Sequence, residues 1–317
     1  METSGAQTVY PPRLRPGDLV KIVSPACPPS RDGIDRGVEV MRSWGLRVEV
    51  GVHVFDSWGY MAGTDADRLA DLNEAFRDPQ VRAIVTSRGG KGTYRIIGGL
   101  DFDAIAADPK PVVGFSDVTH LHLALWARCR VTGVHGPFAN WSDDWSGPDS
   151  AEALRRALMT TDPVVLHRDP HEATAAVQVD GVAEGPLVGG NLDAIRTTVG
   201  AGLPSLAGAI LFLEHQKGTG LGEVDRALTQ MMGSGQLDGL HGVVLGQFLG
   251  FEDIADDPTQ GGWHITDILR DRLTRLDVPV LGGIPAGHGF HPPTIPLGPP
   301  ATIDTTAGTL TVASAVK

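Results

Sequence analysis

The chain has 317 residues, a formal net charge of −12 at pH 7 and a hydrophobic fraction of 41%. This length allows one large or two ordinary domains, each with a full core, and the negative charge argues against a nucleic-acid partner. No apolar leader or membrane-spanning run is visible in the sequence. The two cysteines, Cys27 and Cys129, lack CxxC spacing, which is typical of a reducing compartment. We therefore expect a cytoplasmic protein that binds neither nucleic acid nor membrane.

In the first half of the chain, apolar runs of strand length alternate with helical patterns. The runs cover residues 19–23, 48–52, 81–86 and 112–115. Helical spacing of apolar residues fills 32–44 and 65–76, and a capping box at Thr64 opens the second of these segments. This alternation predicts a parallel sheet covered on both faces, in which ligands bind beyond the carboxyl ends of the strands. We assign it to residues 13–168 and expect residues 1–12 to form a loose tail.

The second half is richer in strands. Strand-like runs cover residues 176–181, 183–188, 209–213, 242–248 and 279–284. Helical patterns cover 192–198, 224–232 and 263–276, and a hairpin signal lies around Ala307 and Gly308. We expect a second, mixed domain over residues 176–317, joined to the first by a polar linker at 169–175.

Ser116 stands where an apolar strand meets a helical pattern. At such a corner the hydroxyl projects away from the sheet, and the N–H groups of the first helical turn can face an oxyanion. This is the geometry of a nucleophile elbow, although Val118 replaces the second glycine of G-x-S-x-G. Taken alone, the local sequence favours a helix-capping serine instead.

A glycine loop at residues 87–93 follows the third strand. It departs from a phosphate-binding Walker sequence because Lys91 is followed by Gly92. The loop can be a tight turn, or an amide-lined turn that directs the Gly90 N–H at a developing oxyanion. Arg88 could hold a substrate carboxylate in bidentate fashion or form a surface ion pair.

Two polar residues end apolar strands in the second half. Glu214 closes one strand, where a carboxylate is costly unless it is paired. His288 lies between two glycines after another strand, which favours exposure to a cleft. Together with Ser116 they offer a nucleophile, a base and an orienting carboxylate in the order Ser, Glu, His, and wide separation in sequence is compatible with a triad.

Aromatic and histidine residues offer further candidates. Trp141 and Trp145 lie in a polar loop and either line a substrate cleft or pack the loop onto the domain. His120 and His122 are two residues apart on a predicted helix and so face different directions, which argues against a zinc site. We expect neither a metal nor a cofactor.

Six short motifs occur along the chain in a characteristic order. They are residues 87–90 (SRGG), 114–117 (GFSD), 135–137 (HGP), 189–192 (GGNL), 211–214 (LFLE) and 287–289 (GHG). With these motifs the chain resembles the LD-carboxypeptidase family of serine peptidases, from about Arg15 to Val312. That family includes muramoyl-tetrapeptide carboxypeptidases and the microcin C immunity protein.

The resemblance implies an α/β fold with two domains. The N-terminal one is a Rossmann- or flavodoxin-like α/β/α domain that carries Ser116, and the C-terminal one is a β-rich, barrel-like (swivelling) α/β domain that carries Glu214 and His288. It also implies that the backbone amides of Asp117 and Gly90 form the oxyanion hole, and that the protein is a homodimer.

For function, the resemblance implies an L,D-carboxypeptidase that releases the terminal D-alanine of murein tetrapeptides during peptidoglycan recycling. An immunity-type hydrolase of aminoacyl or peptidyl nucleotide analogues is the alternative, and a non-catalytic binding protein is a third. Candidate substrate-binding residues are Arg88, Gly89, Trp141, Trp145 and Lys217. The sequence departs from the usual family pattern at Lys91 and at residues 215–217, and these departures concern the substrate and not the triad.

Overall fold

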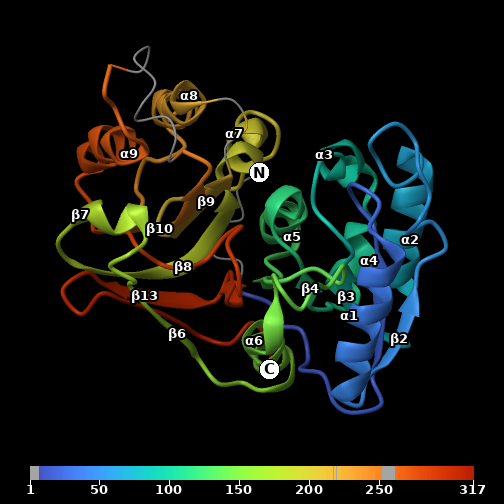
Figure 1. Ribbon diagram of the computed structural model, residues 1–317. Helices are drawn as coiled ribbons and strands as arrows, with labels where there is room; N and C mark the ends of the chain where they lie inside the picture. The colour runs from blue at the N-terminus through green and yellow to red at the C-terminus, as the bar shows by residue number, and fades with distance from the viewer. Residues whose placement is uncertain (1–6, 217, 219, 252–260) are drawn as a thin grey trace. The chain divides into compact units, whose positions relative to one another are not determined.

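The structure, a computed structural model, describes residues 7–216, 218, 220–251 and 261–317 (Figure 1). The chain forms two compact units. Unit 1 comprises Met1–Asp162, Pro293–Pro299 and Ala313–Lys317, and unit 2 comprises Pro163–Pro292 and Pro300–Val312. The division falls before the linker expected at 169–175, and the chain returns twice to unit 1 after its first exit.

The sheet of unit 1 has the strand order β12-β5-β4-β3-β1-β2. Its strands are β1 (Leu19–Val23), β2 (Arg47–Val50), β3 (Val81–Thr86), β4 (Val112–Val113), β5 (Gly133–His135) and β12 (Ile295–Leu297). The first five are parallel in the flavodoxin-like order 2-1-3-4-5, and β12 adds an antiparallel edge. The order reverses between β1 and β3, which is where such sheets bind ligands.

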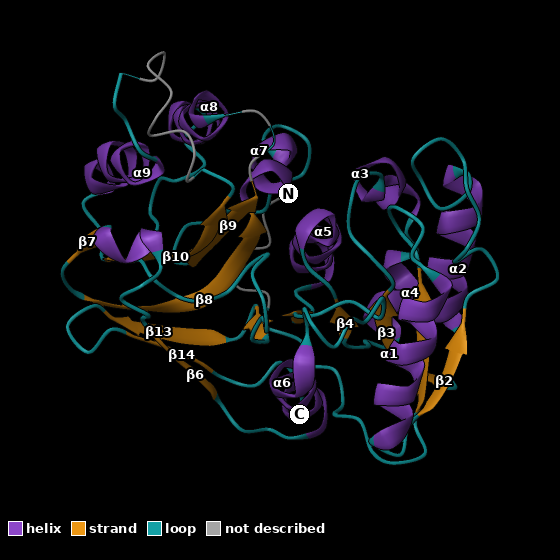
Figure 2. Cartoon of the chain, in the orientation of Figure 1, coloured by secondary structure: helices purple, strands orange, loops and turns teal. Residues whose placement is uncertain are grey.

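Helices cover both faces of this sheet, as the alternating sequence pattern predicts (Figure 2). They are α1 (Arg31–Ser43), α2 (Asp65–Arg77), α3 (Thr93–Ile96), α4 (Phe102–Ala107), α5 (Thr119–Cys129) and α6 (Gly147–Met159). On β1, Val20 and Ile22 join the core under α1 and α6, whereas Leu19 and Val23 join the core under α2 and α5. The apolar residues of β1 thus alternate between two cores because both of its faces are buried, and the one charged residue of the strand, Lys21, pairs with Glu49 and Glu74.

The expected loose tail is wrong for the residues just before Arg13. The Val9 N–H donates to the Arg130 carbonyl at 2.9 Å, and the Val9 carbonyl accepts the Thr132 N–H at 3.1 Å. The Lys317 N–H donates to the Pro11 carbonyl at 3.0 Å. Composition suggested a tail, but backbone hydrogen bonds to distant segments anchor it. Residues 1–6 lie outside the described part of the chain.

The sheet of unit 2 has the order β6-β14-β13-β8-β9-β10-β11-β7. Its strands are β6 (Val164–His167), β7 (Gln178–Val179), β8 (Val182–Asn191), β9 (Ile210–Gln216), β10 (Gly242–Leu249), β11 (Val280–Leu281), β13 (Pro300–Asp304) and β14 (Thr309–Val312). The long strand β8 pairs antiparallel with β13 up to Pro186 and parallel with β9 beyond it. The sheet is therefore mixed, and it forms a curled half-barrel, which confirms the predicted barrel-like fold of this part of the chain.

Three helices pack on this sheet, namely α7 (Leu192–Thr198), α8 (Leu221–Gly233) and α9 (Ile265–Leu273). The hairpin of β13 and β14 confirms the turn predicted around Ala307 and Gly308. The segment 169–175, expected to be a linker, is packed into unit 2. The Thr174 hydroxyl donates to the Gly246 carbonyl at 2.9 Å and accepts the Gly283 N–H at 3.0 Å.

Across the described ranges, no helix is both long enough and apolar enough to cross a membrane.

His122 braces the end of β4 from inside the core. Its Nε2 lies 2.9 Å from the Gly114 carbonyl, to which it donates, and its Nδ1 would lie 2.4 Å from a Cβ at Gly133. Burial lowers the pKa of His122 to about 4, although the bond to Gly114 acts in the opposite direction. His120 lies elsewhere, with its ring 5.6 Å from that of Tyr94.

This low pKa predicts a specific acid sensitivity. In the unfolded chain the imidazole titrates near 6.5, so the unfolded state binds more protons between pH 6.5 and about 4. The contribution of His122 to the free energy of unfolding is therefore complete above pH 6.5. The free energy of unfolding falls by about 3 kcal/mol as the pH falls from 6.5 towards 4. Denaturant unfolding of His122→Gln should therefore show a weaker pH dependence than the unsubstituted protein over this range. Exposed His171→Gln should leave the dependence unchanged, and equal slopes for all three proteins would contradict the assignment.

Candidate active site

Ser116 has a strained backbone at the carboxyl end of β4. It begins the short 3-10 turn Ser116–Val118 with φ of 58°, in the left-handed region that non-glycine residues occupy at a cost of about 1–2 kcal/mol. Its side chain caps neither this turn nor α5, so the helix-cap interpretation is wrong. The serine is half-buried, and the geometry is that of a nucleophile elbow.

The glycine loop lies directly against this serine. A Cβ at Gly89 would stand 3.2 Å from Ser116 Oγ and 3.0 Å from the Phe138 ring, so a larger residue would crowd the hydroxyl. Gly90 and Gly92 have φ of 112° and 135°, which favours glycine at both positions. The loop thus brings the main chain at Gly89 close to the serine.

The side chain of Asp117 fixes the end of this loop. It is 7% exposed, and its Oδ2 accepts the Thr93 N–H at 2.8 Å, at the start of α3. The carboxylate thus connects the serine turn to the glycine loop, a contact that sequence reasoning missed because it joins residues 24 apart.

An aromatic stack packs around Phe115, the residue before Ser116. The Phe115 ring lies 4.3 Å from Phe138 and 5.8 Å from Trp145, nearly parallel to both. Trp145 is half-buried, whereas Trp141 is only 5% exposed and its backbone N–H donates to the Gly33 carbonyl at 2.9 Å. Trp141 therefore packs the loop onto the domain, and of the two tryptophans Trp145 is the better substrate-binding candidate.

Arg88 is exposed beside Gly89. Its Nη1 donates to the Pro28 carbonyl at 3.4 Å, and within the described part of the chain it makes no ion pair. The surface ion pair considered for Arg88 is therefore not formed there. Lys217, the other cationic candidate, lies outside the described residues.

In unit 2, Glu214 and His288 form a hydrogen-bonded pair. Glu214 lies on β9 with no exposed surface, and its Oε2 accepts from His288 Nδ1 at 2.6 Å. Burial by itself would lower the pKa of His288, but the charge of Glu214 and this hydrogen bond together raise it. With Nδ1 bound to the carboxylate, Nε2 is the ring nitrogen that can accept a proton.

The loop that carries His288 is fixed by Gln247 on β10. The Gly289 N–H donates to Gln247 Oε1 at 2.8 Å, and Gln247 Nε2 donates to Glu172 Oε1 at 2.6 Å. A Cβ at Gly289 would lie 2.5 Å from the Gln247 amide, and one at Gly287 would lie 3.2 Å from Glu214 Oε2. The glycines on both sides of His288 let the loop approach β9 and β10 closely. The sequence analysis missed Gln247, although a glutamine within the apolar run 242–248 is a signal that could have indicated this role.

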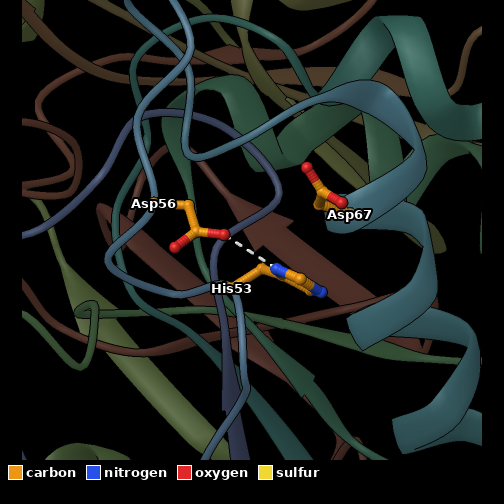
Figure 3. Close-up of side chains that lie close together, drawn as sticks. All are labelled: His53, Asp56 and Asp67. Atoms are coloured by element: carbon orange, nitrogen blue, oxygen red, sulfur yellow. Dashed lines mark hydrogen bonds and ion pairs between the residues drawn. The ribbon is translucent and has the colours of Figure 1, made fainter.

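One group of side chains in the described ranges has the spacing of metal ligands. His53, Asp56 and Asp67 present ligand atoms within 4.8 Å of one another (Figure 3). His53 Nδ1 already pairs with Asp56 Oδ2 at 2.8 Å. Asp67 Oδ2 accepts the Thr64 N–H at 2.9 Å and its hydroxyl at 2.7 Å, in the predicted capping box. These contacts give the three side chains a structural role, which is to hold the loop before α2 in place.

The role of Gln247 can be tested by unfolding. Gln247→Leu would leave the Gly289 N–H and the Glu172 carboxylate without this partner, and we expect the free energy of unfolding to fall by about 2 kcal/mol. Gln178→Leu, at an exposed glutamine of the same unit, should change it by no more than about 0.5 kcal/mol. Equal effects of the two substitutions in urea titrations would show that the Gln247 contacts contribute nothing.

Comparison with known proteins identifies the family. Residues 20–136 match the LD-carboxypeptidase N-terminal domain, and residues 184–303 match the LD-carboxypeptidase C-terminal domain. A Streptomyces coelicolor protein that bears a carboxypeptidase name is 37% identical over 96% of both chains. The murein tetrapeptide carboxypeptidase of Pseudomonas aeruginosa is 30% identical, over 90% of this chain and 92% of its own.

The fold also matches that of a solved protein with a different named role. The microcin C7 self-immunity protein MccF of Escherichia coli, in complex with aspartyl sulfamoyl adenosine, superimposes with a TM-score of 0.82. The match covers 98% of this chain and all of that chain, at 22% identity. Since both domains match in order and relatives of 30% identity or more extend over nearly the full length, the chain belongs to the LD-carboxypeptidase family of serine peptidases.

Proposed function

We propose that this serine carboxypeptidase hydrolyses the amide bond to the terminal D-alanine of murein tetrapeptides, in peptidoglycan recycling. The observation that carries the proposal is the buried hydrogen bond between His288 and Glu214, the base and acid that a serine nucleophile needs. The left-handed turn at Ser116 and the relative named as a murein tetrapeptide carboxypeptidase support it. On the family resemblance we also propose a cytoplasmic homodimer.

In the proposed reaction His288 Nε2 takes the proton of the Ser116 hydroxyl, and Oγ attacks the carbonyl carbon of the scissile amide. The backbone N–H groups of Asp117 and Gly90 hold the oxyanion, and loss of one such donor typically costs about 10²–10³ in rate. His288 then protonates the leaving D-alanine amine, and water hydrolyses the acyl-enzyme. Glu214 keeps the imidazole in the required tautomer and stabilises its charged form.

A carboxypeptidase must also recognise the free carboxylate of its substrate. We assign this to Arg88, because its guanidinium is exposed next to Gly89 and can bind a carboxylate in bidentate fashion. Trp145, beside the serine turn, supplies an apolar surface for the rest of the substrate.

The second candidate is an immunity-type hydrolysis of aminoacyl nucleotide analogues. The fold match to MccF and the half-buried ring of Trp145 favour it, since that ring could stack on a base. The same nucleophile and base would act, so the two candidates differ only in substrate.

Substitution of the nucleophile tests the mechanism, and substrate comparison tests the specificity. Ser116→Ala should abolish D-alanine release from murein tetrapeptide, measured by mass spectrometry, while stability changes by no more than about 1 kcal/mol. Exposed Ser142→Ala is the control and should retain full activity. An active Ser116→Ala variant would overturn the serine mechanism.

Cleavage of aspartyl sulfamoyl adenosine but not of tetrapeptide would favour the second candidate, and cleavage of neither would favour a binding protein.

The charge of Glu214 predicts a shift in the pH profile. His288 must be neutral to act as base, and the carboxylate raises its pKa. Glu214→Gln removes that charge, so the acidic limb of kcat/KM should move to lower pH while the maximal rate falls by about 10⁴. An acidic limb that stays in place would assign it to a group other than His288.

A further inference from the structure

Arg68 carries a buried guanidinium next to the glycine loop. It lies on α2, and its side chain has no exposed surface. We propose that Arg68 is a positioning residue that holds the Gly90 amide where the oxyanion forms. This inference rests on the proposed function, because that function gives the Gly90 N–H its role.

The guanidinium bonds to two separate loops at once. Nη1 donates to the Pro25 carbonyl, in the loop after β1, and to the Gly92 carbonyl at 2.9 Å, in the loop after β3. Nη2 donates to Asp65 Oδ1 and lies 3.3 Å from the sulfur of Met61. A single planar group thus joins the two loops at the point where the strand order of the sheet reverses.

Gly90 belongs to the loop after β3 and packs against the loop after β1. From the loop after β1, the Cys27 N–H donates to the Gly89 carbonyl at 3.2 Å. A Cβ at Gly90 would lie only 2.3 Å from Cys27 Sγ, so the cysteine packs directly against the glycine. Gly92 is two residues further along the glycine loop. Gly90 therefore lies where the two loops that the guanidinium of Arg68 holds together meet.

The local sequence is adapted to this contact. A Cβ at Gly92 would stand 2.8 Å from Arg68 Nη1, so only glycine lets the carbonyl approach the guanidinium in this way. Asp65, the counter-ion of Arg68, is itself held by Arg95, whose Nε and Nη2 donate to its two oxygens at 2.8 and 2.9 Å. This second pair lowers the pKa of Asp65, so the carboxylate stays charged beside Arg68.

Stability alone gives little reason for a charge at this position. A buried ion pair is commonly no more stabilising than apolar residues of similar volume. What arginine adds is a rigid fork of donors that fixes several acceptors in one geometry. Because an oxyanion exists only in the transition state and the tetrahedral intermediate, a displaced Gly90 amide should lower kcat and leave KM nearly unchanged.

The test measures phosphonylation of Ser116 by a fluorophosphonate, which needs the oxyanion donors but not the peptide. Arg68→Ala should slow labelling about 100-fold. Millimolar guanidinium should restore part of the rate by filling the space left by the side chain. Arg95→Ala removes the exposed partner of Asp65 without touching either loop carbonyl, and it should label within about threefold of the unsubstituted rate.

Circular dichroism and thermal melting of each variant separate positioning from folding. If Arg68→Ala does not fold, Arg68→Lys takes its place, because an ammonium keeps the charge but cannot reproduce the planar fork. A folded Arg68→Ala or Arg68→Lys protein that labels at the unsubstituted rate would overturn the inference. Absence of labelling in the unsubstituted protein would instead overturn the proposed serine mechanism.

Discussion

The backbone of Ser116 is the constraint on which the rest of unit 1 depends. A serine in the left-handed region is unfavourable, so the surrounding structure must hold it there. Gly114, two residues before Ser116, accepts a hydrogen bond from His122 through its carbonyl. Asp117, the residue after Ser116, accepts one from the backbone N–H of Thr93. The close approach of Gly89 and the stack on Phe115 complete the support. Buried polar groups thus fix the geometry of the turn.

His288, the proposed base, is supported in a comparable way in unit 2. Glu214 is buried on a central strand, and the imidazole reaches it from a loop that glycines allow to come close. Gln247 holds the loop from the neighbouring strand through its side-chain amide. In each unit, a group with a proposed chemical role lies on a loop at a strand end, and neighbouring strands or helices supply the hydrogen bonds that orient this loop.

Much of this organisation could be predicted from the sequence. Strands β1, β3 and β4 are recognisable because runs dominated by apolar residues are typical of parallel strands that are buried on both faces. Ser116, Glu214 and His288 stood out because polar residues at the ends of such runs need a reason to be there. The capping box at Thr64 and the hairpin at Ala307 were predictable because both depend on local chemistry.

What the sequence did not reveal depends on long-range contacts. The edge strand β12 and the anchoring of Val9 join segments far apart in the chain, and no local pattern encodes such pairings. The burial of Trp141 but not of Trp145 could not be read from a polar loop. Arg68 occupied a helix face that the sequence pattern left unremarked, because a charged residue there is usually solvated.

The central claim is that Ser116 carries the acyl group during turnover. It is tested most directly by mixing enzyme with excess murein tetrapeptide, quenching with acid and mapping the peptides by mass spectrometry. The account predicts a tripeptide ester on the Ser116 peptide, with its level raised when deacylation is slowed. Steady turnover with no adduct on Ser116, or an adduct on another residue, would contradict it.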